Sequence, residues 1–274
     1  MNRFVIVDDP HDPRLATFRL NERGLTNRLQ RRDDAGDGLF MAEGDLVVER
    51  ALQAGCVPRA ALVDAARPPA VADQLAERIE VFAGGDRMRA EVTKLGMPYS
   101  IVALFERPPR ATAGDLAART TRLVLVEAVD NPLNIGSIVR NALGMGWQGL
   151  VFDETSADPL ARRAMRVSMG QSLHLPHARV RSMPDTVTDL VAGGWTVVAL
   201  TPADDALPID EVPIADDERV ALLVGSERAG LSDPAMAAAT HRAAIPMHAG
   251  VDSLNVAAAS AVACWQFRPR KLSS

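Results

Sequence analysis

Five polar side chains in the second half of the chain are spaced so that they could act together on one small ligand. They lie in three segments, residues 131–140, 223–231 and 245–256, each a strand or strand end that runs into glycine, a polar residue and then a helix. Three such loops could surround a polar cofactor with main-chain groups and direct the side chains to one place. The five residues are Asn134, Arg140, Glu227, Ser253 and Asn255.

In the first segment, Asn134 and Arg140 are six residues apart, with Gly136 between them. A helix that begins near Ile135 would place Arg140 in its second turn, within reach of the N-terminal end of the helix. Asn134 could then cap the helix while it holds the preceding loop in shape. A capped surface helix with a solvent-facing arginine explains the same residues, so this segment alone leaves both interpretations open.

In the second segment, Gly225 and Gly230 flank Glu227, directly after the aliphatic run 220–224. Glycine at these positions would let a ligand approach main-chain N–H and C=O groups closely. Glu227 could orient a neighbouring loop or pair with Arg140. A surface turn with a solvated glutamate fits this segment equally well.

The third segment predicts a strand that ends at residues 245–247 and a helix over 254–267. Ser253 is a natural N-cap for that helix, although its hydroxyl could instead face a ligand, and Asn255 stands in the first turn. Capping alone would account for both residues.

A further run, Gly144-Met-Gly146-Trp-Gln-Gly149, fits the dinucleotide fingerprint, but a helix precedes it and a strand follows, so we interpret it as a helix end and turn.

Around these segments the chain predicts two α/β domains joined by a proline-containing linker at 108–114. In the first domain we expect strands at 39–43, 60–63, 79–82 and 100–105 and helices at 45–54, 71–78 and 86–95. In the second, strands rich in aliphatic residues predict a parallel sheet that is buried on both faces. The expected strands are 122–129, 149–152, 195–200 and 220–224, and the expected helices 137–143, 159–168, 185–192 and 233–240.

The composition, 47% apolar and 24% charged, is that of a soluble globular protein. No apolar run reaches the roughly 18 residues of a membrane span, and the start of the chain turns acidic too early for a secretory signal. Cys56 and Cys264 lie in different halves with no metal-ligand spacing, which indicates a reduced, cytoplasmic protein and no metal site. The net charge of −5 includes seven acidic residues that crowd the stretch 204–218.

Arginines supply candidate phosphate contacts in two places. One group shares the predicted helix 159–168, where a solvated basic face is the competing interpretation, and the other lies in the polar first forty residues. The candidates are Arg162, Arg163 and Arg166, and Arg28, Arg31 and Arg32.

Taken together and in this order, the three segments resemble the signature motifs of the SpoU/TrmH family of RNA ribose 2′-O-methyltransferases, within the SPOUT class. The resemblance implies a catalytic domain over 113–274, with a parallel sheet and a C-terminal trefoil knot, that forms a homodimer with the cofactor site at the interface. More weakly, Glu43-Gly44-Asp45 and Tyr99-Ser-Ile-Val-Ala-Leu resemble the small α/β RNA-binding domain of that family, expected here over 1–112.

The resemblance also implies roles for individual residues. Arg140 matches the catalytic arginine, with Asn134, Glu227, Ser253 and Asn255 completing the catalytic set. Because a guanidinium stays protonated at neutral pH, Arg140 is expected at least to stabilise developing negative charge, and whether it also accepts a proton stays open. The residues expected to contact S-adenosylmethionine are Leu200, Thr201, Gly225, Glu227, Gly230, Ile245, Met247, Ser253 and Leu254.

The function that follows is transfer of a methyl group from S-adenosylmethionine to the ribose 2′-OH of a structured RNA. A separate N-terminal domain adds a second grip on a large folded target, which favours 23S-type rRNA over tRNA. Three alternatives stay open: a tRNA ribose methyltransferase, an RNA-binding protein that keeps the fold without turnover, and a nicotinamide-dependent enzyme suggested by the glycine spacing.

Overall fold

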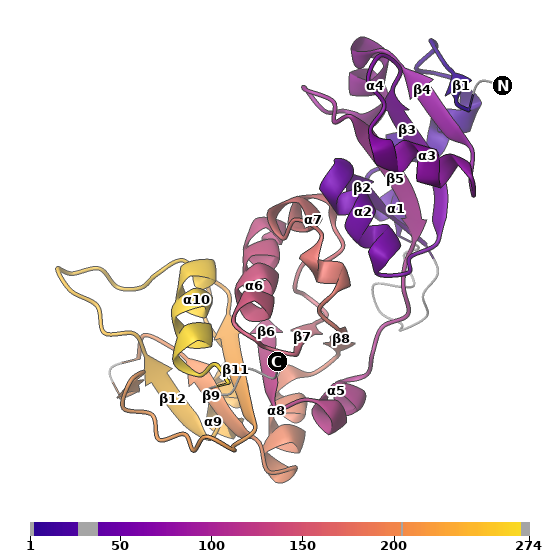
Figure 1. Ribbon diagram of the computed structural model, residues 1–274. Helices are drawn as coiled ribbons and strands as arrows, with labels where there is room; N and C mark the ends of the chain where they lie inside the picture. Colours follow the sequence, from indigo (N-terminus) through magenta and orange to yellow (C-terminus); the bar gives the residue numbers. More distant parts are fainter. Residues whose placement is uncertain (1–2, 27–37, 204, 270–274) are drawn as a thin grey trace. The chain divides into compact units, whose positions relative to one another are not determined.

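The chain folds into two units, seen in a computed structural model that describes residues 3–26, 38–203 and 205–269 (Figure 1). One unit comprises Met1–Pro109 and Leu160–His174, and the other comprises Arg110–Pro159 and Leu175–Ser274. The segment Leu160–His174 therefore packs with the first unit, although the predicted boundary after residue 112 assigned it to the second. Arg28, Arg31 and Arg32 lie outside the described residues.

The first unit is built on a five-stranded mixed sheet in the order β1-β4-β3-β5-β2. β4 pairs in parallel with β1 and β3, whereas β5 pairs antiparallel with β2 and β3. The strands are β1 (Val5–Ile6), β2 (Leu39–Glu43), β3 (Pro58–Asp64), β4 (Val81–Gly84) and β5 (Ile101–Glu106). The four longer strands lie within a few residues of the predicted ones, whereas the two-residue β1 is too short to leave a periodic signal.

Each face of this sheet packs on its own core because successive side chains of a strand point to opposite sides. On one face, Phe40 stacks on Phe105 with 5.4 Å between the ring centroids. Its neighbour Met41 packs with Phe18 and Leu62 on the other face. The helical segments of the unit are η1 (Pro13–Arg19), α1 (Glu22–Leu25), α2 (Asp45–Gln53), α3 (Ala70–Ala76), α4 (Asp86–Thr93), α7 (Arg162–Val167) and η3 (Gln171–Leu173). Leu160 and Met165 bring α7 and its flank into the Phe40 core.

The second unit is built on a seven-stranded sheet in the order β10-β12-β9-β11-β6-β7-β8, and every pairing in it is parallel. The strands are β6 (Arg122–Glu127), β7 (Gly149–Asp153), β8 (His177–Val180), β9 (Thr196–Leu200), β10 (Leu207–Pro208), β11 (Val220–Gly225) and β12 (His241–Ala244). The aliphatic central strands are buried throughout most of their length, so the predicted parallel sheet is confirmed. β8 was not predicted because it mixes polar and small residues, whereas β12 ends at Ala244, directly before the strand end predicted at residues 245–247.

Helices cover both faces of this sheet. Leu116, Val187 and Ala235 pack from α5, α8 and α9 against one set of alternating strand residues. α6 and α10 pack against each other and α10 also against β11, and Nε1 of Trp147 donates to the Cys264 carbonyl over 3.0 Å. The helices are α5 (Ala113–Arg119), α6 (Pro132–Gly144), α8 (Met183–Ala192), α9 (Asp233–Ala238) and α10 (Val256–Gln266).

The glycine-spaced run after α6 is a turn, as predicted. α6 ends at Gly144, Gly146 adopts a φ of 81°, and β7 begins at Gly149. The helix thus precedes the strand, which is the reverse of a dinucleotide-binding loop.

Within the described ranges, no helix is both long and apolar enough to span a membrane. The trefoil knot stays a prediction that the family resemblance implies.

Candidate active site

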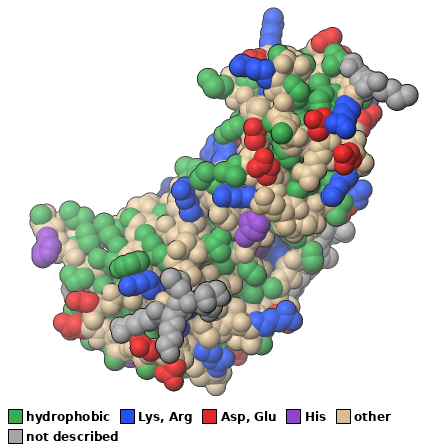
Figure 2. Space-filling view, viewed as in Figure 1, with side chains coloured by type: hydrophobic (Ala, Val, Ile, Leu, Met, Phe, Trp, Pro, Cys, Tyr) green, Lys and Arg blue, Asp and Glu red, His purple; other side chains and the backbone are tan. Residues whose placement is uncertain are grey.

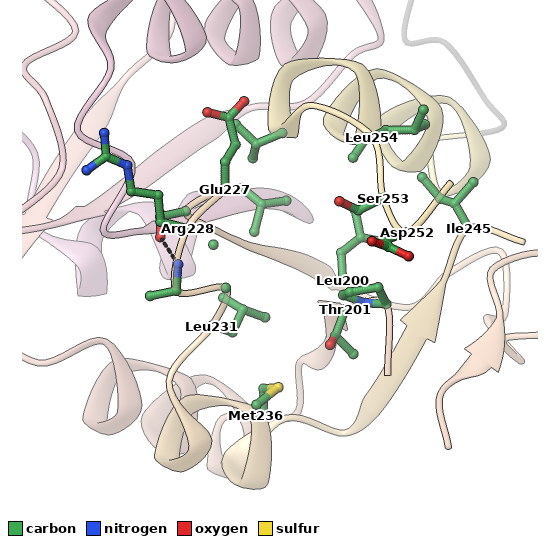
Figure 3. Close-up of a pocket in the computed structure, with 18 of the residues that line it drawn as sticks. Leu200, Thr201, Glu227, Arg228, Leu231, Met236, Ile245, Asp252, Ser253 and Leu254 are labelled. Carbon is green, nitrogen blue, oxygen red and sulfur yellow. Dashed lines mark hydrogen bonds between the residues drawn. The ribbon is translucent and has the colours of Figure 1, made fainter. Parts of the chain in front are cut away.

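A pocket opens in the second unit where β9, β11 and β12 end (Figure 3). Its cavity volume is about 370 Å³, which lies in the range of small-molecule sites. The carboxyl ends of parallel strands share one edge of the sheet, so the loops that follow them converge there. The walls come from residues 200–202 after β9, residues 225–231 after β11, Ile245 and Met247 after β12, and residues 252–254 before α10.

The structure places all nine predicted cofactor contacts in the lining of this single pocket. These residues are Leu200, Thr201, Gly225, Glu227, Gly230, Ile245, Met247, Ser253 and Leu254. Figure 3 shows Leu200, Thr201 and Ser253 on one side of the pocket, opposite Leu231. Residues up to 54 positions apart in the chain therefore meet at one cavity, as the family resemblance implied.

The loop after β11 needs its first glycine for closure of the loop itself. A Cβ on Gly225 would lie 2.5 Å from the carbonyl carbon and oxygen of Gly230, far inside van der Waals contact. The loop is closed by the N–H of Gly230, which donates to the Ser226 carbonyl over 2.9 Å, and Gly230 itself has a φ of 69°. Gly225 is thus required sterically within the main chain, and its expected contact with a ligand stays a prediction.

One side-chain amide links the three predicted segments. Nδ2 of Asn255 donates to the carboxylate of Glu227 and lies 3.3 Å from Oδ1 of Asn134. Its own Oδ1 accepts the N–H of Ala257 over 2.9 Å and so caps α10. The N-cap of α10 is therefore Asn255, and the predicted cap, Ser253, instead lies in the pocket lining.

The predicted start of α6 was also wrong, and this changes the positions of Asn134 and Arg140. α6 begins at Pro132, and the cap is Asn131, whose side chain accepts the N–H of Leu133 over 3.0 Å. Proline suits the first helical position because the missing N–H has no partner there in any case. Asn134 is consequently a buried residue in the first turn, free to bond to Asn255.

Arg140 stands apart from the other four predicted catalytic residues. It lies in the third turn of α6, is exposed, and is not among the residues that line the pocket. Within the described part of the chain its side chain makes no hydrogen bond or ion pair, and Glu227, its predicted partner, bonds to Asn255 instead. The chain thus joins Asn134, Asn255 and Glu227 by hydrogen bonds and lines the pocket with Glu227 and Ser253, whereas Arg140 belongs to neither group.

Sequence reasoning missed two charged residues of the lining, Arg228 and Asp252. It also missed Asp153 at the end of β7, which holds the loop between β6 and α6. Its carboxylate accepts the N–H of Ala128 over 3.0 Å and the hydroxyls of Thr155 and Ser156. Burial raises the pKa of this carboxyl, but the hydrogen bonds outweigh it and the pKa is lowered overall. The run Asp153-Glu-Thr-Ser156 was the available signal.

Two of the predicted RNA-binding arginines on α7 are committed to a carboxylate within the first unit. The side chain of Glu43 is 1% exposed; Arg162 binds it directly, and Nη1 of Arg166 lies 3.3 Å from its second oxygen. Arg162 also donates to the Thr93 carbonyl over 3.0 Å. Only Arg163 is exposed, so it is the one residue of this group that we retain as a candidate RNA contact.

Comparison with known proteins gives consistent results. The family model described as SpoU rRNA Methylase family matches residues 121–265. An uncharacterised tRNA/rRNA methyltransferase of Mycobacterium bovis is 36% identical, over 95% of this chain and 90% of its own length. The 23S rRNA (guanosine(2553)-2′-O)-methyltransferase of Bacillus subtilis is 29% identical, over 84% of this chain and 88% of its own length.

The crystal structure of an AdoMet-bound rRNA methyltransferase from Sinorhizobium meliloti superposes with a TM-score of 0.82 at 26% identity. The match covers 99% of this chain and 100% of that one. The likeness therefore extends over both units of the fold, beyond the residues that the family model matches.

Proposed function

Because this chain belongs to the SpoU rRNA methylase family, we propose that it transfers a methyl group from S-adenosylmethionine to the ribose 2′-OH of a structured RNA. The observation that carries the proposal is the Asn134–Asn255–Glu227 link beside the pocket. Helix capping explains Asn255 alone, but it does not explain why one amide joins all three segments at the edge of a ligand-sized cavity.

The residues of the pocket suit S-adenosylmethionine. Leu200, Leu231 and Ile245 supply apolar walls for an adenine ring. None of the hydrogen bonds among the described residues uses the main-chain N–H of Met247 or Leu254, so both amides are available to a purine edge or a carboxylate. We assign the cofactor-contact role to the nine predicted lining residues on this basis.

Bound S-adenosylmethionine supplies an electrophilic methyl group on a sulfonium. The protein then has to hold the ribose hydroxyl in line and to stabilise the charge that develops on its oxygen. Arg140 has for that purpose an exposed guanidinium that pairs with none of the described residues. Asn255 keeps Glu227 and Asn134 in place, which makes these residues positioning groups. Methyl transfer releases the hydroxyl proton to solvent, or to Arg140 if that side chain has first lost its own proton, so electrostatic stabilisation is the minimum role of Arg140.

We propose that the active form is a homodimer, which would bring Arg140 of one protomer beside the pocket of the other. The support is apolar surface on the two helices that flank the site. On α10, Val262 is 40% and Trp265 58% exposed, and on α6 Leu133 is 46% exposed. Trp265→Glu is expected to shift the sedimentation mass from two chains towards one and to reduce turnover with it. A wild-type chain that sediments as a monomer while active would contradict the dimer.

We propose rRNA as the substrate, in the cytoplasm. The Bacillus subtilis relative is named for 23S rRNA, and a first unit separate from the site offers a second grip on a large RNA. Figure 2 shows basic and acidic side chains interspersed over the visible face, so this face carries separate basic side chains in place of a broad basic patch. Mapping 2′-O-methyl sites in rRNA and tRNA from cells with and without the gene identifies the substrate, and a lost site in tRNA would contradict this choice.

The reaction is tested by incubating the purified protein and deproteinised rRNA with methyl-labelled S-adenosylmethionine. Alkaline cleavage of RNA requires a free 2′-OH, so methylation there leaves the label in alkali-resistant dinucleotides. Label recovered entirely in mononucleotides would exclude ribose as the acceptor. Tight binding of RNA without uptake of S-adenosylmethionine, measured by calorimetry, would instead favour an RNA-binding protein without turnover.

A further inference from the structure

Arg228 is the one cationic side chain among the described residues that line the pocket. It is exposed and makes no side-chain hydrogen bond or ion pair with the described part of the chain. In Figure 3 its guanidinium points away from Leu231 and Met236, on the side of the pocket where the carboxylate of Glu227 lies. The charge thus lies at the rim of the pocket, whereas the apolar walls lie inside.

The loop holds Arg228 at this rim. Ala229 donates its N–H to Oγ of Ser226 over 3.1 Å, and Gly230 donates to the Ser226 carbonyl over 2.9 Å. These two bonds tie the residues on either side of Arg228 into one closed turn. The neighbouring Glu227 bonds to Asn255, so it leaves the guanidinium available to a ligand. An exposed arginine on a fixed turn loses less freedom on binding than one on a mobile loop.

The geometry of a nucleotide indicates which group of the substrate would lie near this guanidinium. The 2′-OH and the 3′-phosphate of a nucleotide sit on adjacent carbons of one sugar ring. A ribose that turns its 2′-OH into the pocket must therefore bring its 3′-phosphate to the rim. The other charged lining residues, Glu227 and Asp252, are carboxylates and would repel a phosphate, whereas a guanidinium binds one through paired N–H donors.

We propose that Arg228 binds the RNA phosphate next to the target ribose and so positions the 2′-OH for methyl transfer. The inference rests on the proposed function and adds a residue to it. A carboxylate of the cofactor is the competing oxyanion. The direction of the side chain, away from the interior of the pocket, argues for the phosphate.

The test compares Arg228→Ala and Arg228→Lys with a matched control, Arg119→Ala. Arg119 is exposed at the end of α5, next to the amino end of β6, whereas the pocket is at the carboxyl ends of the strands. For Arg228→Ala we expect KM for rRNA to rise about 10-fold. The plot of log affinity against log salt concentration should become less steep by about 0.7 to 1, which corresponds to the loss of one phosphate contact. Arg228→Lys restores the slope, and Arg119→Ala changes neither quantity.

Calorimetry with S-adenosylmethionine separates the two oxyanions. Cofactor affinity within about two-fold of wild type in Arg228→Ala supports the phosphate, whereas a 10-fold loss assigns Arg228 to the cofactor and overturns the proposal. Unchanged KM and salt slope in a variant with wild-type melting temperature also overturn it. Absence of methylation by the wild-type chain would instead remove the proposed function, which keeps the two failures distinct.

Discussion

Nδ2 of Asn255 lies 3.3 Å from Oδ1 of Asn134, although 121 residues separate the two in the chain. The same amide donates to the carboxylate of Glu227, and its oxygen caps α10. An asparagine amide has two N–H donors and one acceptor oxygen, so this side chain uses all of its polar groups. Its removal should loosen α6, the loop after β11 and the start of α10 together.

Asn255→Ala and Asn255→Asp separate capping from this link. Alanine removes both, so we expect a loss of about 1 kcal/mol in the free energy of unfolding and at least a 10-fold loss of cofactor affinity. Aspartate keeps the capping oxygen but removes the donors and sets a second carboxylate beside Glu227, so affinity should fall at least as far. Calorimetry and urea unfolding measure the two quantities. Cofactor binding by Asn255→Asp equal to that of wild type would show that the link is dispensable.

The two glycines of the loop after β11 should respond differently to alanine. Gly225→Ala puts a methyl group into the backbone of Gly230, so the loop must open and cofactor binding should fall at least 10-fold. Gly230→Ala meets no atom within 4 Å and incurs only the cost of a positive φ, about 1 kcal/mol. Calorimetry on both variants tests whether Gly225→Ala loses more cofactor affinity than Gly230→Ala. An equal loss in the two variants would contradict this prediction.

Arg140→Ala is expected to abolish measurable turnover, a loss of at least about 100-fold, while cofactor affinity stays within a few-fold. The reason is geometric, because Arg140 lies outside the pocket of its own chain. Single-turnover methylation and calorimetry give the two values. Loss of cofactor binding in this variant would assign Arg140 a scaffolding role instead.

Arg162 and Arg163 are neighbours with different predicted roles. Arg162→Ala leaves the buried carboxylate of Glu43 without its main partner, so the free energy of unfolding should fall by about 3 kcal/mol. Arg163→Ala removes an exposed charge and should leave stability within about 0.5 kcal/mol while reducing the salt dependence of RNA binding. Urea unfolding of the full chain and filter binding over a salt series compare them. Equal stability of the two variants would contradict the role of the Glu43 pair.

Asp153→Asn tests the carboxylate that holds the loop between β6 and α6. Because the folded state lowers the pKa below its ordinary value of 3.8, the ionised carboxylate contributes stability above that value and loses it as pH falls through the folded pKa. We expect Asp153→Asn to unfold about 1 to 3 kcal/mol more easily at pH 7, with the difference shrinking as the medium becomes more acidic. Asp217→Asn, an exposed acid in the loop before β11, is the control. A difference that does not vary with pH would rule out the charge as its cause.

The amino-acid sequence by itself was enough to locate the three segments and most of the strands that position them. Aliphatic runs such as 220–224 have to be buried, and parallel strands bring their following loops to one edge of the sheet. The nine predicted pocket residues were implied by the family resemblance, and all of them line one cavity because they follow strands that end at this edge. The order of helix and strand around Gly146 likewise followed from local pattern.

Tertiary structure decided what each polar side chain touches. Asn131 and Asn255 cap their helices in place of the predicted Asn134 and Ser253, and Oδ1 of Asn134 accepts instead from Asn255, 121 positions away in the chain. Burial of Glu43 turned Arg162 from a candidate RNA contact into a structural one. Local patterns report which face of an element is apolar, but only packing between distant segments selects the partner of a hydrogen bond or a charge.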